Sequence, residues 1–213
     1  MVTVDLQNKS KEFQELYARA NPLPEARAKV PLLEVASGDG DAVFVTESLV
    51  VCEYIAEKFG AAAFLPESAE DRAASRLFTE LCGGAFGYVA VLRAPAGAPR
   101  DAAVRALRDG LAGADAFLRR RGSAPFLLGE RFSLAEANAA PFVQRRCAVL
   151  PEYSAIDPLA LCDEMGLEHL KRWMEAVLAR PSVIRTGVPR ERLLENVSTM
   201  LERFAAVEAS KAG

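Results

Sequence analysis

The chain has 213 residues, of which 51% are hydrophobic and 26% are charged, a balance typical of a globular protein with one large domain or two small ones. Lys and Arg number 26 and Asp and Glu number 29, so the net charge of −3 argues against nucleic acid as a partner, because nucleic acid requires a positive surface. The single histidine, His169, excludes a histidine-rich metal site, and we expect no metal.

The cysteines of the sequence do not form a metal or dithiol motif. They are Cys52, Cys82, Cys147 and Cys162, separated by 30, 65 and 15 residues. We interpret them as reduced thiols of a cytoplasmic protein, because disulfides are rare in that compartment. The sequence has no apolar run of about 18 residues and no basic segment followed by an apolar one at its start, so we expect neither a membrane span nor a secretion signal.

Residues 1–66 alternate between strand and helix patterns, which predicts an α/β domain. Two β-branched runs on either side of a Gly-Asp-Gly turn predict a β-hairpin. The expected elements are, in order, a strand over Val2–Leu6, a helix over Lys9–Ala20, strands over Leu32–Val35 and Ala42–Thr46, and a helix from Glu47-Ser48 to a cap at Gly60.

Residues 67–213 show helical periodicity and no further strand pattern, which predicts an all-helical second domain. Ser68 and Asp71 form a capping box at the start of the first helix. We expect the helices to be interrupted at Ala94–Pro99, Gly122–Pro125, Leu150–Pro158 and Pro181.

The turn before the first hairpin strand, Lys29-Val30-Pro31, is one candidate binding element. If the bond before Pro31 is cis, the backbone N–H and C=O of Val30 lie at the lip of the strand, where an extended peptide could pair with them. The alternative is an ordinary trans proline ahead of a strand, which base rates favour.

The junction Glu47-Ser48, which follows the second hairpin strand, is another candidate. Ser48 is a favourable N-cap, and the helix N-terminus behind it would stabilise a ligand carboxylate. The carboxylate of Glu47 would hold an ammonium group, so the junction offers partners for both charges of an amino acid. The alternative is a capped helix with a solvated acid. Because one hairpin separates the two candidates, we expect both to lie on the same side of the sheet.

The order of these motifs resembles the glutathione transferases, in particular the omega-like, cysteine-type classes. The resemblance covers nearly the whole chain, and order and spacing carry it more than any single motif. The similar segments are KVPLLE (29–34), TESLVVCEYIAEKFG (46–60), FLP (64–66), FLLGERFSLAE (126–136), in which Ser133 caps and Glu136 reciprocates, and EHLKRWMEAVLARPSV (168–183). The resemblance implies a thioredoxin-like N-terminal domain over residues 1–66, joined to an all-helical C-terminal domain over residues 67–213.

The resemblance also implies a ligand and its contacts. Glutathione, as co-substrate or ligand, would lie in the cleft between the domains. Val30 would offer its backbone to the cysteinyl part, with Pro31 cis, Glu47 and Ser48 would hold the γ-glutamyl amine and carboxylate, and Lys29 would meet the glycyl carboxylate. A hydrophobic electrophile would bind in a second-substrate pocket, and members of the family commonly form homodimers. The candidate residues of that pocket are Phe86, Tyr88 and Arg93.

The sequence departs from the family pattern at its start. Family members begin with a strand, a loop that carries the catalytic Cys, Ser or Tyr, and a helix, about 30 residues in all. We expect this unit to be absent, so no catalytic residue is assigned and conjugation or thiol transfer is expected to be weak or lost. We expect Cys52 and Cys82 to serve in packing rather than as replacement nucleophiles, because burial raises the pKa of a thiol.

Three alternatives remain open at the level of sequence. The chain could be a non-catalytic binding protein for bulky apolar ligands such as pigments or tetrapyrroles. It could be a scaffold in a larger complex, with the open edge of its sheet completed by a partner strand. The sequence could also be a shortened form of a longer one.

Overall fold

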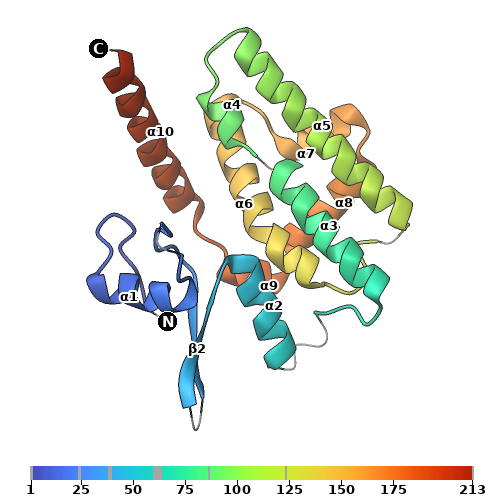
Figure 1. The fold of residues 1–213 in the computed structure, drawn as a ribbon. Coiled ribbons are helices and arrows are strands. Elements are labelled where there is room, and N and C mark those ends of the chain that lie inside the picture. Colours follow the sequence, from blue (N-terminus) through green and yellow to red (C-terminus); the bar gives the residue numbers. More distant parts are fainter. Residues whose placement is uncertain are drawn as a thin grey trace. The chain divides into compact units, whose positions relative to one another are not determined.

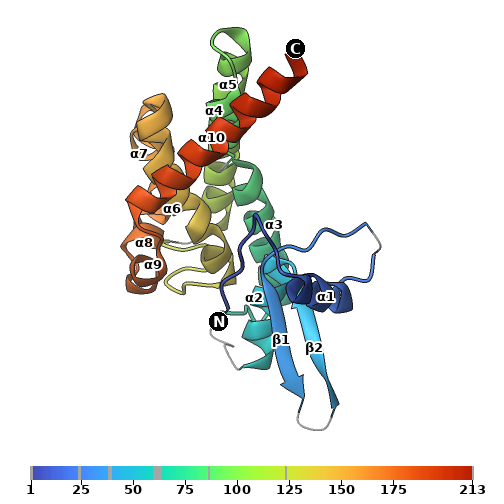
Figure 2. The same cartoon turned by 90° about the vertical axis from the view of Figure 1, so that its left-hand side faces the viewer.

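The computed structural model describes residues 2–23, 25–37, 40–59, 64–85, 87–122 and 124–212. The chain divides after Leu65 into an N-terminal unit and a helical unit. Figures 1 and 2 show the elements of both units. Each unit is described by itself below.

The N-terminal unit contains a β-hairpin and two helices. Strands β1 (Leu32–Ser37) and β2 (Gly40–Thr46) pair in the antiparallel direction, which confirms the predicted hairpin; the residues at the tip of its turn lie outside the described ones. Helix α2 (Ser48–Lys58) follows β2 directly, and the position of its predicted cap, Gly60, also lies outside the described residues. Helix α1 (Lys11–Ala20) begins where Ser10 Oγ accepts a hydrogen bond from the Phe13 N–H.

Helix α1 lies against the hairpin. The guanidinium of Arg19 stacks on the ring of Phe44 in β2, with its central carbon 4.4 Å from the ring centroid. On the inner face of the helix Tyr17 is buried, whereas Val51 and Ala56 are the buried residues of α2. The core of this unit is therefore small, and a two-stranded sheet depends on such helix packing for its stability.

The strand predicted over Val2–Leu6 is wrong. In the structure this segment has no strand geometry, and the side chains of Val2 and Leu6 are 87% and 57% exposed. A strand requires a neighbour to receive its backbone hydrogen bonds, and among the described residues β1 and β2 pair only with each other. The β-branched pattern alone therefore does not make this segment a strand, because neither described strand pairs with it.

The helical unit contains eight helices within the described residues. The helices are α3 (Ala69–Ala85), α4 (Val89–Arg93), α5 (Ala98–Arg121), α6 (Leu134–Ser154), α7 (Pro158–Met165), α8 (Glu168–Ala179), α9 (Pro181–Thr186) and α10 (Arg190–Ala212). The predicted capping box at Ser133 and Glu136 is confirmed at the start of α6, as is the cap of Ser68 on the Asp71 N–H at the start of α3. The interruption predicted over Leu150–Pro158 is confirmed but is shorter than expected, because α6 continues through Pro151 to Ser154 and α7 begins at Pro158. The C-cap of α6, Ala155, has a left-handed φ of 55°.

The core of the helical unit lies among α3, α5, α6 and α8. Its centre is Trp173 of α8, whose ring meets Phe78 of α3 edge-on at 5.0 Å between centroids. Helices α3 and α5 approach so closely that a Cβ on Gly110 would lie 2.7 Å from the Cα of Ala85, so this position requires glycine. The residues of this core that have no exposed surface include Phe78, Leu111, Val143, Leu170, Met174 and Val177.

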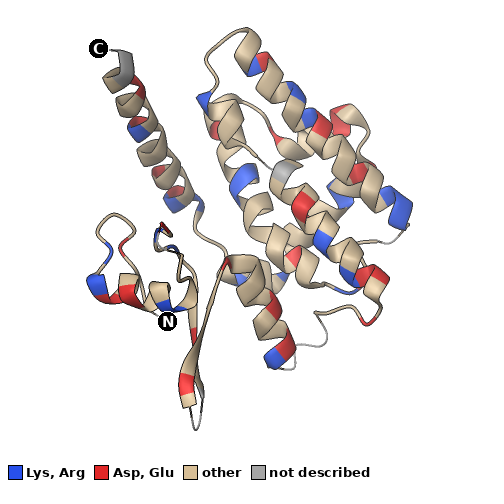
Figure 3. Ribbon diagram, viewed as in Figure 1, with Lys and Arg blue, Asp and Glu red and all other residues tan. Residues whose placement is uncertain are grey.

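Two buried carboxylates tie the helices together. Glu136 accepts hydrogen bonds from the Leu127 N–H and the Trp173 Nε1–H, at 2.9 and 3.0 Å, as well as from Ser133. Asp115 of α5 accepts from the Leu170 N–H at 2.9 Å and so caps the N-terminus of α8, which has no side-chain cap of its own. On the outside, positive and negative residues are mixed along α5 and α10, as Figure 3 shows.

Candidate functional site

The two candidate elements of the N-terminal unit lie at the same end of the hairpin. The register places Leu32, the first residue of β1, opposite Thr46, the last residue of β2. Pro31 precedes Leu32 and Glu47 follows Thr46, so the two turns are neighbours at this hairpin end. The register thus brings the two turns to the same end of the hairpin, and that they lie on one side of the sheet stays a prediction. The Val30–Pro31 peptide bond is cis, as the resemblance implied.

Glu47 has an unusual backbone conformation at this hairpin end. Its φ is 65° and its ψ is 120°, a region that residues with a Cβ rarely occupy. Such a conformation costs on the order of 1–3 kcal/mol and is found mainly where a site requires it. It turns the chain from β2 directly into α2, so that the exposed Glu47 side chain stands beside the helix N-terminus.

The start of α2 is open to solvent. Glu47 is the N-cap and makes no side-chain cap, whereas Ser48 is the first helical residue, so the prediction of Ser48 as the N-cap is wrong by one position. The Glu47 carbonyl accepts the first helical hydrogen bond, from the Val51 N–H at 2.9 Å. Ser48 and the two residues after it are exposed, and their N–H groups carry the partial positive charge of the helix end. This helix end is suited to a carboxylate.

Lys29 and Val30 complete the hairpin end on the β1 side. Both are exposed, Val30 to 46%, so its backbone groups are accessible to a ligand. Lys29 makes no ion pair within the described part of the chain. Together with Glu47 and the start of α2, the hairpin end offers one ammonium, one carboxylate, one helix N-terminus and one free peptide group.

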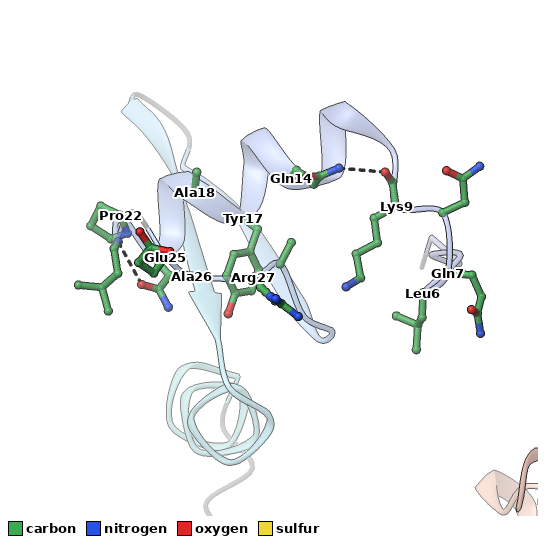
Figure 4. A pocket seen from close by; sticks show the side chains of 14 residues that line it. Leu6, Gln7, Lys9, Gln14, Tyr17, Ala18, Pro22, Glu25, Ala26 and Arg27 are labelled. Atoms are coloured by element: carbon green, nitrogen blue, oxygen red, sulfur yellow. Dashed lines mark hydrogen bonds between the residues drawn. The ribbon is translucent and has the colours of Figure 1, made fainter. Parts of the chain in front are cut away.

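A polar groove of about 760 Å³ lies beside α1, within the same unit. It is lined by residues 6–9, by the face of α1 that carries Gln14, Tyr17 and Ala18, and by described residues of the segment 21–28, which ends next to Lys29. In Figure 4 the side chains of Lys9, Tyr17 and Arg27 lie on the same side of α1. No pattern in the sequence predicts this groove, because the path of the irregular segment 21–28 brings its walls together.

The four thiols of the chain are all poor nucleophiles at neutral pH. Burial raises the pKa of Cys52 and, despite the nearby charge of Arg146, that of Cys82, which has no exposed surface. Burial also raises the pKa of Cys147 and of Cys162 to about 11. Since the thiolate is the reactive form, these side chains act in packing, as expected for Cys52 and Cys82.

The three residues predicted to line a second-substrate pocket lie in different surroundings or outside the described residues. Phe86 lies outside the described residues. Tyr88 occupies the N-cap position of α4 without a side-chain cap and is only 9% exposed, so it is a core residue. Arg93, at the end of α4, is engaged by α10: it stacks on Phe204 and pairs with Glu208.

The described residues hold no group of three or more His, Cys, Asp or Glu side chains that could bind a metal ion. In the same part of the chain no helix combines the length and the apolar composition that crossing a bilayer requires.

Comparison with protein families identifies the helical unit. Residues 98–176 match the family model described as "Glutathione S-transferase, C-terminal domain". The match places residues 98–176 in that C-terminal domain family. The fold of the whole chain is that of the glutathione transferases, with a thioredoxin-like N-terminal part and a helical C-terminal domain. No match to the sequence is found among curated proteins.

Solved structures of glutathione transferases share this fold at low sequence identity. The trimeric glutathione transferase TDR1 of Leishmania is 24% identical with a TM-score of 0.71, over 92% of this chain and 41% of the other. Omega 2C of Trametes versicolor is 21% identical with a TM-score of 0.71, over 93% of this chain and 85% of the other. Rice GST1, solved in complex with glutathione, is 20% identical with a TM-score of 0.70, over 95% of this chain and 85% of the other. The chain thus spans less than half the length of TDR1.

Proposed function

We propose that the chain binds glutathione at the hairpin end formed by Lys29, Val30, Glu47 and Ser48, and that it acts in a glutathione transferase or thiol-transferase reaction. The observation that carries the proposal is the register of the hairpin, which sets the cis Val30–Pro31 turn beside Glu47 and the open N-terminus of α2. The glutathione transferase fold and the glutathione-bound structure of rice GST1 support the choice of ligand.

The chemistry of the hairpin end fits the γ-glutamyl group. The Glu47 carboxylate binds the α-ammonium, whereas the Ser48 hydroxyl and the first N–H groups of α2 bind the α-carboxylate. The backbone of Val30 pairs with the extended cysteinyl residue, and Lys29 binds the glycyl carboxylate. Each charge of the ligand thereby meets an opposite charge or a helix end.

Isothermal titration calorimetry tests this arrangement. Glu47→Ala combined with Ser48→Ala should weaken glutathione binding by about tenfold to a hundredfold, because a hydrogen bond to a charged group is worth about 1.5–3 kcal/mol. Ala retains a Cβ, so the backbone strain at position 47 is the same in the variant as in the wild type. Glu57→Ala is the matched control, since Glu57 is an exposed acid on the same helix. Equal affinity in the double variant and the control would contradict the proposal.

A ligand analogue tests whether Glu47 binds the α-ammonium group. Glutathione without its α-amino group should bind the wild-type chain more weakly than glutathione does. In Glu47→Ala the two ligands should bind alike, because the partner of the ammonium is gone. If the variant still prefers glutathione to this analogue by the wild-type factor, Glu47 does not hold the amine.

We also propose that conjugation by this chain is slow. The support is chemical, because burial raises the pKa of each of its four thiols and leaves no cysteine to act as a thiolate. Binding of glutathione and an electrophile side by side would then contribute proximity alone. Transfer of glutathione to 1-chloro-2,4-dinitrobenzene measures this, and turnover in the normal range of enzymes, about 1–1000 per second, would contradict it.

A cytoplasmic location and a homodimeric state complete the proposal. Four free cysteines support a reducing compartment. Dimers are typical of the family, although the Leishmania relative is trimeric. Light scattering after size exclusion distinguishes a dimer near twice the chain mass of 23.0 kDa from a trimer or a monomer.

A further inference from the structure

The groove beside α1 offers more room than the proposed glutathione contacts use. Its volume of about 760 Å³ lies within the range of about 300–1,000 Å³ that is typical of sites for whole small molecules. Among the described residues that line it, none is one of the four proposed to bind glutathione, Lys29, Val30, Glu47 and Ser48. The groove is therefore additional space next to the hairpin end.

Hydrogen bonds within the chain fix the walls of this groove. Gln14 Nε2 donates to the Lys9 carbonyl at 3.0 Å and so ties the turn before α1 to the helix, as the dashed line in Figure 4 shows. On the opposite wall the Ala26 N–H donates to the Leu23 carbonyl at 3.0 Å. Between the two walls Tyr17 of α1, which is only 3% exposed, also lines the groove. The shape of the groove therefore does not depend on a ligand.

The lining suits peptide groups that end in a carboxylate. Four of its side chains are amides, each able to donate to a peptide group and to accept from one: Gln7, Asn8, Gln14 and Asn21. Lys9 and Arg27 add two positive charges, and Glu25 adds one negative charge. Neither Lys9 nor Arg27 makes an ion pair within the described part of the chain. Both cations are therefore available to an acidic group.

The groove begins where the proposed glutathione site ends. Ala28 lines the groove, and the two residues that follow it belong to the hairpin end. In the proposed arrangement the γ-glutamyl group lies at Glu47, which follows β2, whereas the glycyl group lies at Lys29, which precedes β1. A ligand chain that continues past the glycyl residue is thereby directed toward residues 25–28 and into the groove.

We propose that the groove binds the C-terminal extension of a γ-glutamyl-cysteinyl-glycyl peptide, in which one or two further residues follow the glycine and end in an acidic group. Arg27 and Lys9 bind the acidic end, and the amide side chains bind the added peptide groups. The inference rests on the proposed function and deepens it, because it names a class of substrate longer than glutathione. Glutathione itself ends at Lys29 and does not make these contacts.

Isothermal titration calorimetry with synthetic peptides tests the inference. The peptide γ-glutamyl-cysteinyl-glycyl-aspartate should bind about tenfold more tightly than glutathione, because one added hydrogen bond between charged groups corresponds to about that factor. The same peptide with asparagine amide as its last residue should gain less, since it keeps the added peptide groups but has no carboxylate there.

Two variants separate the charge of the groove from its space. Arg27→Gln removes a cation and Ala26→Trp fills the groove with an indole, so each should lose most of the gain from the extension. Glutathione binding by each variant, measured in the same way, shows that the variant is folded. Lys11→Gln is the matched control and should keep the gain, because Lys11 is an exposed cation of α1 that pairs with Glu15 outside the described lining of the groove.

The outcomes distinguish this inference from the proposed function. If the wild type binds glutathione and the aspartate peptide equally well, or if both variants keep the full gain, the inference fails and the proposed function stands. Binding of neither ligand would refute the proposed function, and the inference with it. Hydrogen exchange reports the position of the extension: the saturating aspartate peptide should slow exchange of the backbone amides in residues 25–28 more than saturating glutathione does. Equal protection by the two ligands would contradict binding in the groove.

Discussion

The buried carboxylate of Glu136 makes the sharpest prediction about stability. It accepts four hydrogen bonds: at Oε1 from the Leu127 N–H and the Trp173 indole, and at Oε2 from the Ser133 N–H and hydroxyl, between 2.6 and 3.0 Å. None of the four residues exceeds 1% exposure, so water cannot replace a lost acceptor. This one side chain therefore fastens the start of α6, the preceding loop and α8 to one another.

Glu136→Gln should destabilise the helical unit by about 3 kcal/mol. The amide keeps one oxygen for Leu127 and Trp173 but turns an NH₂ group toward Ser133. The serine hydroxyl can rotate to accept from this NH₂, whereas the Ser133 N–H is left buried without an acceptor. The cost is one charge-assisted bond, about 1.5–3 kcal/mol, plus a buried unsatisfied donor, about 1–3 kcal/mol. Glu136→Ala, which removes every acceptor, should cost about 5 kcal/mol, the upper end for single substitutions.

Urea unfolding followed by fluorescence measures this effect selectively, because Trp173 is the only tryptophan. At about 2–4 °C per kcal/mol for a domain of this size, Glu136→Gln should lower Tm by roughly 6–12 °C. Glu175→Gln, on the exposed face of α8, should change the free energy of unfolding by less than about 0.5 kcal/mol. A Glu136→Gln variant as stable as Glu175→Gln would refute the account of this buried network.

Two further predictions concern the hairpin end and the thiols. Glu47→Gly should raise the free energy of unfolding by about 1 kcal/mol, because the relief of strain at a φ of 65° exceeds the entropic cost of glycine. The same substitution should weaken glutathione binding, because it removes the carboxylate. A Glu47→Gly variant that is less stable than Glu47→Ala would contradict this prediction. Burial raises the pKa of Cys147 and of Cys162 from an ordinary 9.0 to about 11 in the folded chain. The stability that the neutral thiols contribute is therefore fully present below pH 9 and is lost as the pH rises toward 11. The urea midpoint should therefore fall between pH 9 and pH 10.5, and more steeply than in a Cys147→Ala, Cys162→Ala variant; parallel curves would argue against buried, neutral thiols.

Features that depend on residues close in sequence were predictable. The capping box at Ser133 and Glu136 requires only a spacing of three, and the hairpin requires only two β-branched runs and a turn. Since the turn fixes the register, the proximity of Pro31 and Glu47 followed from the same short-range pattern. The candidate binding end was therefore accessible from the sequence, apart from the exact cap of α2.

Features that depend on a distant partner were not predictable in the same way. Val2–Leu6 has the composition of a strand, but whether it forms one is decided by the presence of a free edge with room for it. The cap of α8 comes from Asp115, 55 residues before the amide that it binds. A sequence pattern shows that the start of α8 needs an acceptor but does not show which carboxylate reaches it.

Arg93 shows how such a distant contact changes a functional interpretation. The resemblance assigns this residue to a pocket for an electrophile, which requires a free guanidinium. In the structure the guanidinium is paired with Glu208, 115 residues later in the chain. Because the guanidinium of Arg93 on α4 contacts Phe204 and Glu208 of α10, a substitution at either end of this contact changes the surroundings of the other.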